Sequence, residues 1–144
     1  MLPTPEPAGA QILAHTETDH QLHALLKQVR ACSACAHALP LGPRPVLHIS
    51  PRARLLIAGQ APGTKVHETG IPFNDAPGDR PRAWLGMDRN PFYDTETVAI
   101  VPMGLCYPCV LPKGGVRPPT PVCVLFVRKL SLYLLPTICL TPAL

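Results

Sequence analysis

The sequence predicts one α/β domain, a three-layer α/β/α sandwich with a short central parallel sheet. The chain has 144 residues, which is enough for one hydrophobic core but not for a second domain. Apolar residues recur at helical spacing near the N-terminus, and two short apolar runs further along each end in a turn rich in glycine and proline. Because 20 residues are proline and only 15% are charged, we expect long helices to be scarce.

The N-terminal part predicts a disordered segment followed by a helix. Residues 1–17 begin with a proline-rich stretch and are expected to be disordered, so that the folded domain covers residues 18–144. Within this domain, Thr18–Ala31 is predicted to be a helix with Asp19 as its N-terminal cap. The apolar residues that recur on one face of this helix are Leu22, Leu25, Leu26 and Val29.

The middle of the chain predicts a strand and a short helix. Cys32–Ser50 contains three prolines and is expected to be an irregular connection, after which Arg54–Gly59 is the first strand. Asp79–Leu85 is predicted to be a short helix, because proline is tolerated in the first helical turn and Pro81 falls there. Trp84 is expected to pack inward from this helix.

The last third of the chain completes the predicted sandwich. Val98–Val101 is a β-branched run that predicts the second strand. A helix is expected at Val124–Leu134, followed by a third strand at Thr137–Thr141. Strands that alternate with helices in this way favour a parallel sheet covered on both faces.

Composition and charge exclude few functions. The formal net charge is +4, and Glu96 is the last acidic residue, so the second half of the chain is basic and permits contact with phosphates. The N-terminus lacks the pattern of a secretory signal, which favours the cytoplasm, where cysteines are ligands or free thiols. Arg128 and Lys129 interrupt the apolar C-terminal segment, so no membrane anchor is expected.

The most informative stretch follows the first predicted strand. Gly59–Gly63, with the sequence GQAPG, is a turn at the carboxyl end of that strand, where open α/β sheets bind their ligands. Ten residues further on, Phe73, Asn74 and Asp75 place a flat apolar ring beside an amide and a carboxylate. These groups stack on a planar heterocycle and hydrogen-bond to its edge, so the stretch predicts a pocket for a nucleobase.

The same residues carry a family resemblance. Gly59–Gly63 and Gly70–Asp75 resemble the first motif of the uracil-DNA glycosylase superfamily, and most of all its small bacterial iron-sulfur branch. The resemblance continues through Gly78–Arg80, Trp84–Gly86 and Val101–Pro108. It implies a base excision repair enzyme that hydrolyses the N-glycosidic bond of uracil or another deaminated base in DNA. It also implies a monomer that needs no nucleotide cofactor.

The resemblance implies a role for each pocket residue. Phe73 would stack on the flipped base, or else be an ordinary core phenylalanine. Asn74 would read the base edge, or else belong to an ordinary turn before Pro77 and Gly78. The backbone amides around Gln60 and Ala61 would bind the carbonyl oxygens of the base. Gly63 would allow the base to approach the backbone closely.

Water activation is the least defined step. Several relatives carry an acidic residue within the first motif, where this chain has Gln60 and Ala61, neither of which is a general base. The nearest carboxylates are Asp75 and Glu68, which would otherwise be solvated loop charges, and we assign the catalytic positions to Gln60 and Asp75. Departure of the base through an oxocarbenium-like route depends less on the attacking water than on stabilisation of the leaving anion.

Four further side chains flank the predicted pocket. His67 would contact a phosphate or the leaving base, or else be a histidine of a surface loop. Lys65, Arg80 and Arg82 would meet the DNA backbone, or else be ordinary solvated charges.

The cysteines predict a metal centre. Cys32 and Cys35 form a C-x2-C pair, while Cys106 and Cys123 lie much further along the chain. The resemblance implies that these four thiolates hold one structural [4Fe-4S] cluster.

Two alternatives to a cluster remain open. Cys106 and Cys109 make a second C-x2-C pair, which with the first gives a zinc pattern, although the gap between the pairs is long for a zinc ribbon. The cysteines are otherwise unrelated thiols that pack as small hydrophobes. Cys139 lies in an apolar strand pattern and is expected to be a buried free thiol.

The resemblance ends before the C-terminus. The family contributes a second signature there, a histidine followed by proline and serine, whereas all six histidines of this chain occur at or before His67. We therefore expect a truncated member whose last strand and catalytic loop are missing, with a shifted reading frame as one explanation. The rival interpretations are a DNA-binding or base-binding remnant without turnover and a small cysteine-metal protein unrelated to DNA.

Overall fold

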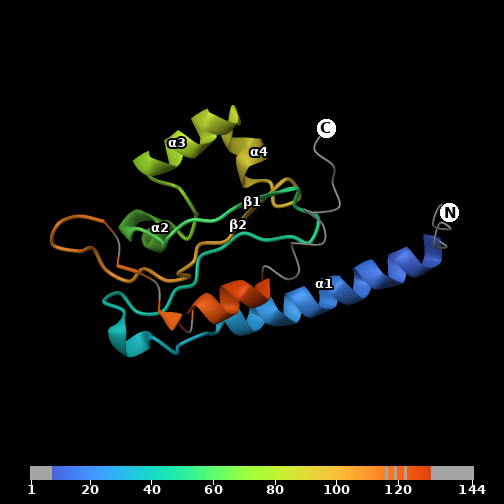
Figure 1. Ribbon diagram of the computed structural model, residues 1–144, viewed down its shortest axis with the longest axis horizontal. Helices are drawn as coiled ribbons and strands as arrows, with labels where there is room; N and C mark the ends of the chain where they lie inside the picture. The colour runs from blue at the N-terminus through green and yellow to red at the C-terminus, as the bar shows by residue number, and fades with distance from the viewer. Residues whose placement is uncertain (1–7, 116, 119, 122, 131–144) are drawn as a thin grey trace, which may run out of the picture.

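The fold is α/β, as predicted, with a short parallel sheet between two layers of helices. The computed structural model describes residues 8–115, 117–118, 120–121 and 123–130. On one side of the sheet lie α1 (Ala8–Arg30) and the helical segment of residues 123–130. These two helices run beside each other (Figure 1). On the other side lie α2 (Thr64–Thr69), α3 (Ala76–Leu85) and α4 (Arg89–Tyr93).

The sheet consists of two parallel strands, β1 (Leu55–Ile57) and β2 (Val98–Ile100). In their register Leu55 pairs with Val98 and Ile57 with Ile100. A parallel pair needs a long crossover connection, and the segment that contains α2, α3 and α4 provides it. On the other edge of β2, the N–H of His48 donates to the carbonyl of Ile100 at 2.9 Å, so part of the connection predicted as irregular adds an antiparallel bridge.

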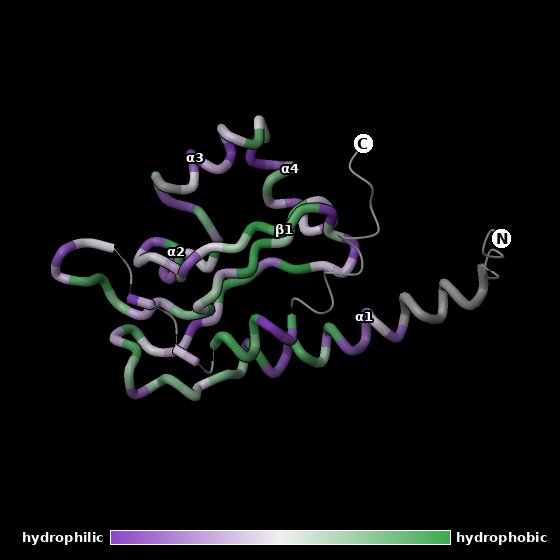
Figure 2. Tube along the Cα trace, viewed as in Figure 1, coloured by the Kyte–Doolittle hydropathy of each residue, from purple (hydrophilic) through white to green (hydrophobic). Residues whose placement is uncertain are grey.

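The strand β2 divides the core into two halves because its side chains alternate between the two faces of the sheet. Ala99 and Val101 face α1, where they pack in one cluster with buried leucines and Val29. Val98 and Ile100 face the other layer, where they pack on Phe92 of α4. Figure 2 shows the apolar stretches of the strands, of the C-terminal half of α1 and of residues 123–130 converging on this centre.

The N-terminal helix differs from the prediction in length. The predicted inward residues Leu22, Leu25, Leu26 and Val29 are all buried, which confirms the helical face. However, α1 begins at Ala8 and includes residues 8–17, which we had expected to be disordered. Asp19 is therefore inside the helix, and its prediction as a cap is wrong. At 23 residues the helix also contradicts the expectation that long helices are scarce, because none of the prolines falls between residues 8 and 30.

The helix predicted at Asp79–Leu85 also begins earlier than expected. The true N-terminal cap of α3 is Asp75, whose side chain accepts a hydrogen bond from the N–H of Gly78 at 3.2 Å. The prediction that Trp84 packs inward is wrong: this side chain is 78% exposed on the outer face of α3. The inward position of the helix is occupied by Arg82 instead.

The C-terminal predictions are only partly covered. Residues 123–130 are helical, in agreement with the first part of the helix predicted at Val124–Leu134. The predicted strand Thr137–Thr141 and Cys139 lie outside the described residues. Within the described part of the chain, no helix is long and apolar enough to cross a membrane. The short helices α2 and α4 were not predicted, because six and five residues are too few to show a helical period.

Candidate functional site

The site is a cavity of about 200 Å³ at the carboxyl end of β1. Its lining includes the turn Gly59–Gly63 together with Phe73 and Asp75. Two backbone hydrogen bonds of 2.8 Å tie this turn to the turn after β2: Met103 donates to the carbonyl of Gly59, and Gly104 donates to that of Gln60. The cavity therefore lies between the ends of the two parallel strands, as the sequence predicts for a ligand site.

Phe73 forms one wall of the cavity in an unusual backbone conformation. Its φ is +54°, in the left-handed region that non-glycine residues rarely adopt. A β-carbon on Gly59 would lie 3.4 Å from Cζ of this ring, so the tip of the ring reaches the first residue of the turn. Behind it, Phe92 contacts the ring edge to face with 6.2 Å between the ring centroids.

Asp75 contributes the carboxylate among the residues that line the cavity. One oxygen, Oδ1, is occupied as the N-terminal cap of α3. The other, Oδ2, points toward Gly63, where it would lie 3.5 Å from an added β-carbon. Asp75 thus has a structural role, and its second oxygen lies close to Gly63 of the turn.

Asn74 does not line the described cavity. Its Oδ1 accepts a hydrogen bond from Nη2 of Arg89 at 3.0 Å, and the guanidinium of Arg89 lies over the ring of Tyr93. The side chain is therefore directed toward α4. The structure brings Gln60, Ala61, Gly63, Phe73 and Asp75 together and leaves out Asn74.

Among the side chains predicted to meet DNA, Arg82 is placed differently from the expectation. It is only 7% exposed, and its guanidinium pairs with Asp79. Neither a phosphate contact nor a solvated charge fits this position, so both interpretations of Arg82 are wrong. Lys65 and Arg80 are exposed, as both of their interpretations require.

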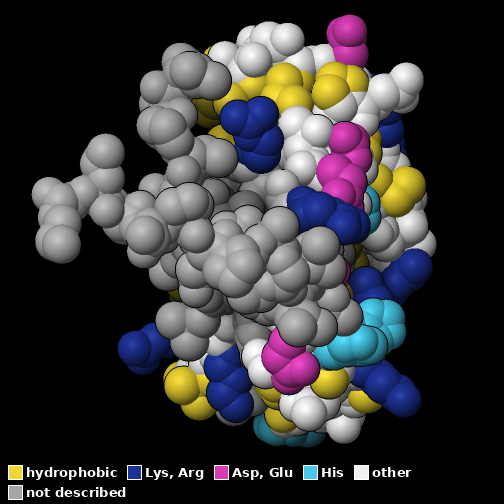
Figure 3. Space-filling view, turned by 90° about the vertical axis from the view of Figure 1, so that its right-hand side faces the viewer, with side chains coloured by type: hydrophobic (Ala, Val, Ile, Leu, Met, Phe, Trp, Pro, Cys, Tyr) yellow, Lys and Arg dark blue, Asp and Glu magenta, His cyan; other side chains and the backbone are white. Residues whose placement is uncertain are grey.

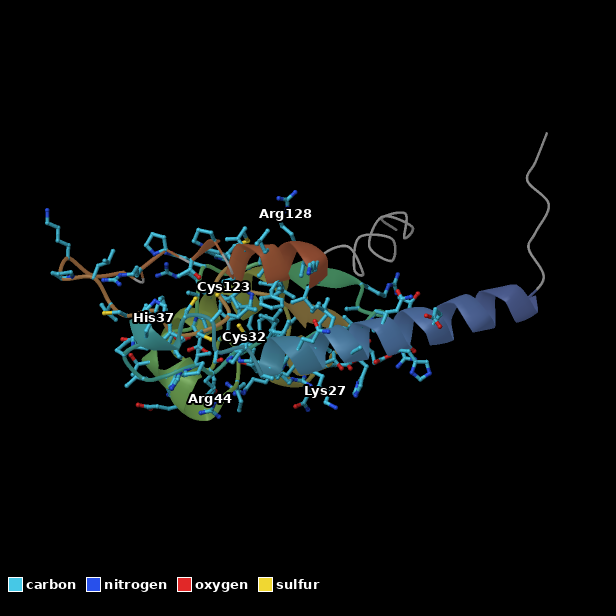
Figure 4. The ribbon with its side chains drawn as sticks, turned by 90° about the horizontal axis from the view of Figure 1, so that it is seen from below. Lys27, Cys32, His37, Arg44, Cys123 and Arg128 are labelled. Carbon is cyan, nitrogen blue, oxygen red and sulfur yellow. The ribbon has the colours of Figure 1, made fainter. Side chains whose placement is uncertain are left out.

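His67 lies in α2 and does not line the cavity. Its side chain is half-buried against Tyr107, with 6.1 Å between the rings, and its Nδ1 has no hydrogen-bond partner among the described residues. The alternative of a surface-loop histidine is therefore wrong. The carbonyl groups of His67 and Glu68 accept hydrogen bonds from Arg44, which reaches α2 from the connection before β1 (Figure 4).

Three of the four cysteines predicted as ligands act on the fourth, Cys106. Burial raises the pKa of the Cys106 thiol to about 11, a backbone hydrogen bond from Arg44 opposes this shift, and the thiols of Cys123, Cys32 and Cys35 add to it. Cys32 and Cys123 lie at the adjoining ends of α1 and residues 123–130 (Figure 4). The fold therefore gathers residues that are up to 91 positions apart in the sequence.

Cys109 stands apart from this group. Its Sγ donates a hydrogen bond to the carbonyl of Val110, and it is not among the groups that shift the pKa of Cys106. Its φ is +113°, a conformation that favours glycine. In the part of the chain that the structure describes, no three His, Cys, Asp or Glu side chains are placed closely enough to hold a single metal ion.

The charges near the surface are mixed. On the face seen in Figure 3, Lys and Arg side chains alternate with Asp and Glu, so the net positive charge is not gathered there into one patch. The basic residues Lys113, Arg117, Arg128 and Lys129 of the second half are all exposed. The charge distribution alone does not identify a nucleic-acid surface.

The sequence interpretation missed the residues that support the cavity from behind. Arg82, Phe92 and Tyr93 come from α3 and α4 and contact the segment that contains Phe73. No local pattern identifies them, because the contacting residues are 9 to 21 positions apart and belong to different elements. The one available signal in the sequence was Arg82, an arginine at a position of the predicted helix that should face the core and be apolar.

Comparison with known families agrees with this geometry. The family model of the Uracil DNA glycosylase superfamily matches residues 47–141, about two thirds of the chain. The match includes both strands, the turn Gly59–Gly63, Phe73 and Asp75. It also includes Cys106 and Cys123 and begins after Cys32 and Cys35.

Proposed function

Because the chain belongs to the Uracil DNA glycosylase superfamily, we propose that it is a DNA glycosylase-like protein of base excision repair. Its substrate class is DNA that contains uracil or another deaminated base. The observation that carries this proposal is the cavity between Phe73 and the turn Gly59–Gly63 at the end of β1. At about 200 Å³ it is smaller than the pockets that hold drug-sized ligands, and its size suits a single heterocycle.

Recognition of the base follows from the two walls. The ring of Phe73 provides a flat apolar surface for an extruded base. Beside it, the turn presents backbone N–H groups, and that of Ala61 donates to no other described residue. A carbonyl oxygen of a bound base would accept this hydrogen bond, which also stabilises the negative charge that develops as the base leaves.

Hydrolysis then requires a water molecule beside the sugar. As the bond between the base and C1′ breaks, its electron pair leaves with the base, and the sugar becomes oxocarbenium-like. The oxygen of water adds to C1′, and its proton passes to a nearby acceptor. We assign this acceptor to Oδ2 of Asp75, which lies near Gly63 while Oδ1 caps α3, and we assign Gln60 to orient the water from the turn.

A single-turnover assay tests the proposal. Single- and double-stranded oligonucleotides with one uracil, one hypoxanthine or no lesion are incubated with excess protein, and abasic sites are counted after alkaline cleavage. We expect base release from a lesion strand and none from the undamaged strand. Phe73→Leu, which removes the planar ring but keeps an apolar side chain, should lower the rate by about 10-fold or more.

The assay also distinguishes the proposed hydrolase from its main alternative. Asp75 has only one free oxygen, and no histidine lines the described cavity. These observations favour, as a second candidate, a protein that captures the base without turnover. Binding of the uracil strand in a gel-shift assay without abasic-site formation would establish that candidate and contradict the hydrolase.

We also propose that Cys32, Cys35, Cys106 and Cys123 hold a [4Fe-4S] cluster. The thiols of Cys32, Cys35 and Cys123 act on Cys106 while Cys109 does not, which supports this ligand set over the zinc pattern that needs Cys109. Four soft thiolates match the irons of such a cluster, and a cluster is larger than one ion, so its ligands stand further apart. When bound, the cluster would tie the end of α1 to the loop after β2.

Anaerobic purification tests the cluster. We expect iron and acid-labile sulfide in near-equal amounts, with the broad visible absorption of an iron-sulfur protein. Cys123→Ser should lose most of the iron, whereas the matched variant Cys109→Ser should keep it. A colourless protein that contains zinc and loses it in Cys109→Ser would support the zinc alternative.

A further inference from the structure

We propose that Arg82 is a positioning residue for the ring of Phe73, an inference that rests on the proposed base site. The need for such a residue comes from the backbone. A phenylalanine with a φ of +54° is in a sparsely populated conformation, and such a conformation persists only where surrounding contacts hold it. The direction of the ring follows from this φ, so whatever holds the backbone also sets the wall of the cavity.

Arg82 makes the contact that holds this backbone. It lies on the inner face of α3 and is 7% exposed. Its Nη1 donates to the carbonyl oxygen of Phe73 at 3.2 Å and lies 3.1 Å from the hydroxyl of Tyr93. Its Nη2 pairs with Asp79 on the same helix, which fixes the plane of the guanidinium.

Tyr93 extends the same support to the preceding residue. Its hydroxyl donates to the carbonyl oxygen of Pro72 at 2.8 Å. Two successive carbonyl groups, those of Pro72 and Phe73, are thus hydrogen-bonded to side chains of α3 and α4. Because both groups are fixed, the peptide unit between these residues cannot rotate to release the left-handed conformation.

The aromatic residues complete the support. The guanidinium of Arg82 lies over the rings of Phe92 and Tyr93, at 5.4 and 5.9 Å from their centroids. Phe92 in turn meets the ring of Phe73. Arg82 therefore acts on Phe73 twice, through its carbonyl group and through the ring that lies behind it.

A purely structural role does not account for an arginine here. An apolar side chain would fill the inner face of α3 without the cost of removing a charge from water. Arg82 does not line the cavity, so it cannot contact a bound base. Unlike the ammonium group of lysine, the planar guanidinium of arginine donates hydrogen bonds in several fixed directions at once. The position thus favours a residue that presets the stacking ring.

Fluorine NMR of the full chain provides the test. The protein has three phenylalanines, so labelling with 4-fluorophenylalanine gives three signals, and Phe73→Leu assigns the one of interest. We expect Arg82→Met to shift and broaden the Phe73 signal of the free protein. In a titration with free uracil, it should weaken binding by about 10-fold or more. Arg128→Met, on an exposed arginine of another helix, is the matched control and should leave both unchanged.

Two milder variants keep the test decisive if Arg82→Met does not fold. Tyr93→Phe keeps the ring and removes only the hydroxyl, and Arg82→Lys keeps the charge and loses the planar fork. Both should move the Phe73 signal in the same direction, by less than Arg82→Met does. A Phe73 signal and a uracil affinity that match the wild type in these variants would overturn the inference.

The same spectra separate this inference from the proposed function. If uracil does not perturb the Phe73 signal of the wild-type protein, the base site is contradicted. The effect of Arg82 on that signal is still measured without ligand. It then supports or overturns the positioning role independently.

Discussion

A β-carbon on Gly78 would lie only 1.8 Å from the carbonyl oxygen of Phe73. The first turn of α3 and the stacking residue are therefore in direct backbone contact. Gly78 is required for a close approach and not for flexibility. Gly78 also provides the N–H that donates to the capping side chain of Asp75. The helix cap, the close contact and the ring of Phe73 therefore form one structural unit.

Gly78→Ala should destabilise the protein. Alanine gains about 1 kcal/mol of helix propensity over glycine, but the clash with Phe73 costs about 3 kcal/mol in a packed site, so the clash decides the sign. Chemical denaturation should therefore show a net loss of about 2 kcal/mol. Gly63→Ala is the stability control, because its φ of −81° suits alanine and its nearest neighbour would be 3.5 Å away. Equal stability of the two variants would contradict the close contact.

Substitutions at Asp75 should separate capping from chemistry. Asp75→Ala removes the cap of α3 and should cost about 1 kcal/mol of unfolding free energy. Asp75→Asn keeps an oxygen for the cap and should cost much less, yet it lacks a carboxylate to accept a proton. We expect Asp75→Asn to keep the melting temperature and to release uracil more slowly. Unchanged release by Asp75→Asn would remove the proposed role of Oδ2.

Cys109→Gly should stabilise the protein. The φ of +113° strains a residue that carries a β-carbon, and relief of this strain is worth about 1 kcal/mol. For a domain of this size the melting temperature should rise by about 2 to 4 °C, as measured by calorimetry. Cys109→Ala removes the thiol but keeps the strain and should show no such gain. If both variants behave alike, the effect comes from the thiol and not from the backbone.

His48 should make the protein less stable as the pH falls. Burial, with a smaller contribution from Arg30, lowers the pKa of His48 below its ordinary value of 6.5. Below pH 6.5 the unfolded chain therefore binds a proton that the folded chain does not, and stability declines until the pH reaches the folded pKa. One such group contributes at most about 1.4 kcal/mol per pH unit.

The measurement is the melting temperature between pH 8 and pH 5. We expect His48→Gln to flatten the acid side of this profile, since it removes the titrating group and keeps the backbone bridge to Ile100. The exposed residue His37 offers the matched substitution His37→Gln. A profile of His48→Gln that parallels the wild type down to pH 5 would show that the half-buried ring of His48 does not carry the acid sensitivity.

Local patterns were sufficient for the elements whose residues interact along the chain. The period of leucines found the inward face of α1, and the two short apolar runs found both strands. The turn Gly59–Gly63 was recognised because glycine and proline restrict the backbone directly. The start of α1 was missed because the proline count describes the whole chain, whereas the prolines are unevenly distributed along it.

The predictions failed for side chains whose burial depends on the tertiary structure. Trp84 was expected inside because it is large and apolar, and Arg82 outside because it is charged. In the structure Trp84 is exposed and Arg82 is buried. The carbonyl of Phe73, the carboxylate of Asp79 and two aromatic rings together provide a site for a buried guanidinium. Those partners come from three segments, so no local rule anticipates them.

The amino-acid sequence was sufficient to predict the α/β class, the parallel strand pair, the turn at the end of β1 and the family, because each depends on local spacing or on an ordered motif. The folded structure was needed to show that Phe73 and Asp75 line the cavity while Asn74 turns to Arg89. It also decided that Cys109 stands apart from the other thiols. The physical reason is that the direction of a side chain is set by neighbours from distant segments, and these neighbours exist only once the chain has folded.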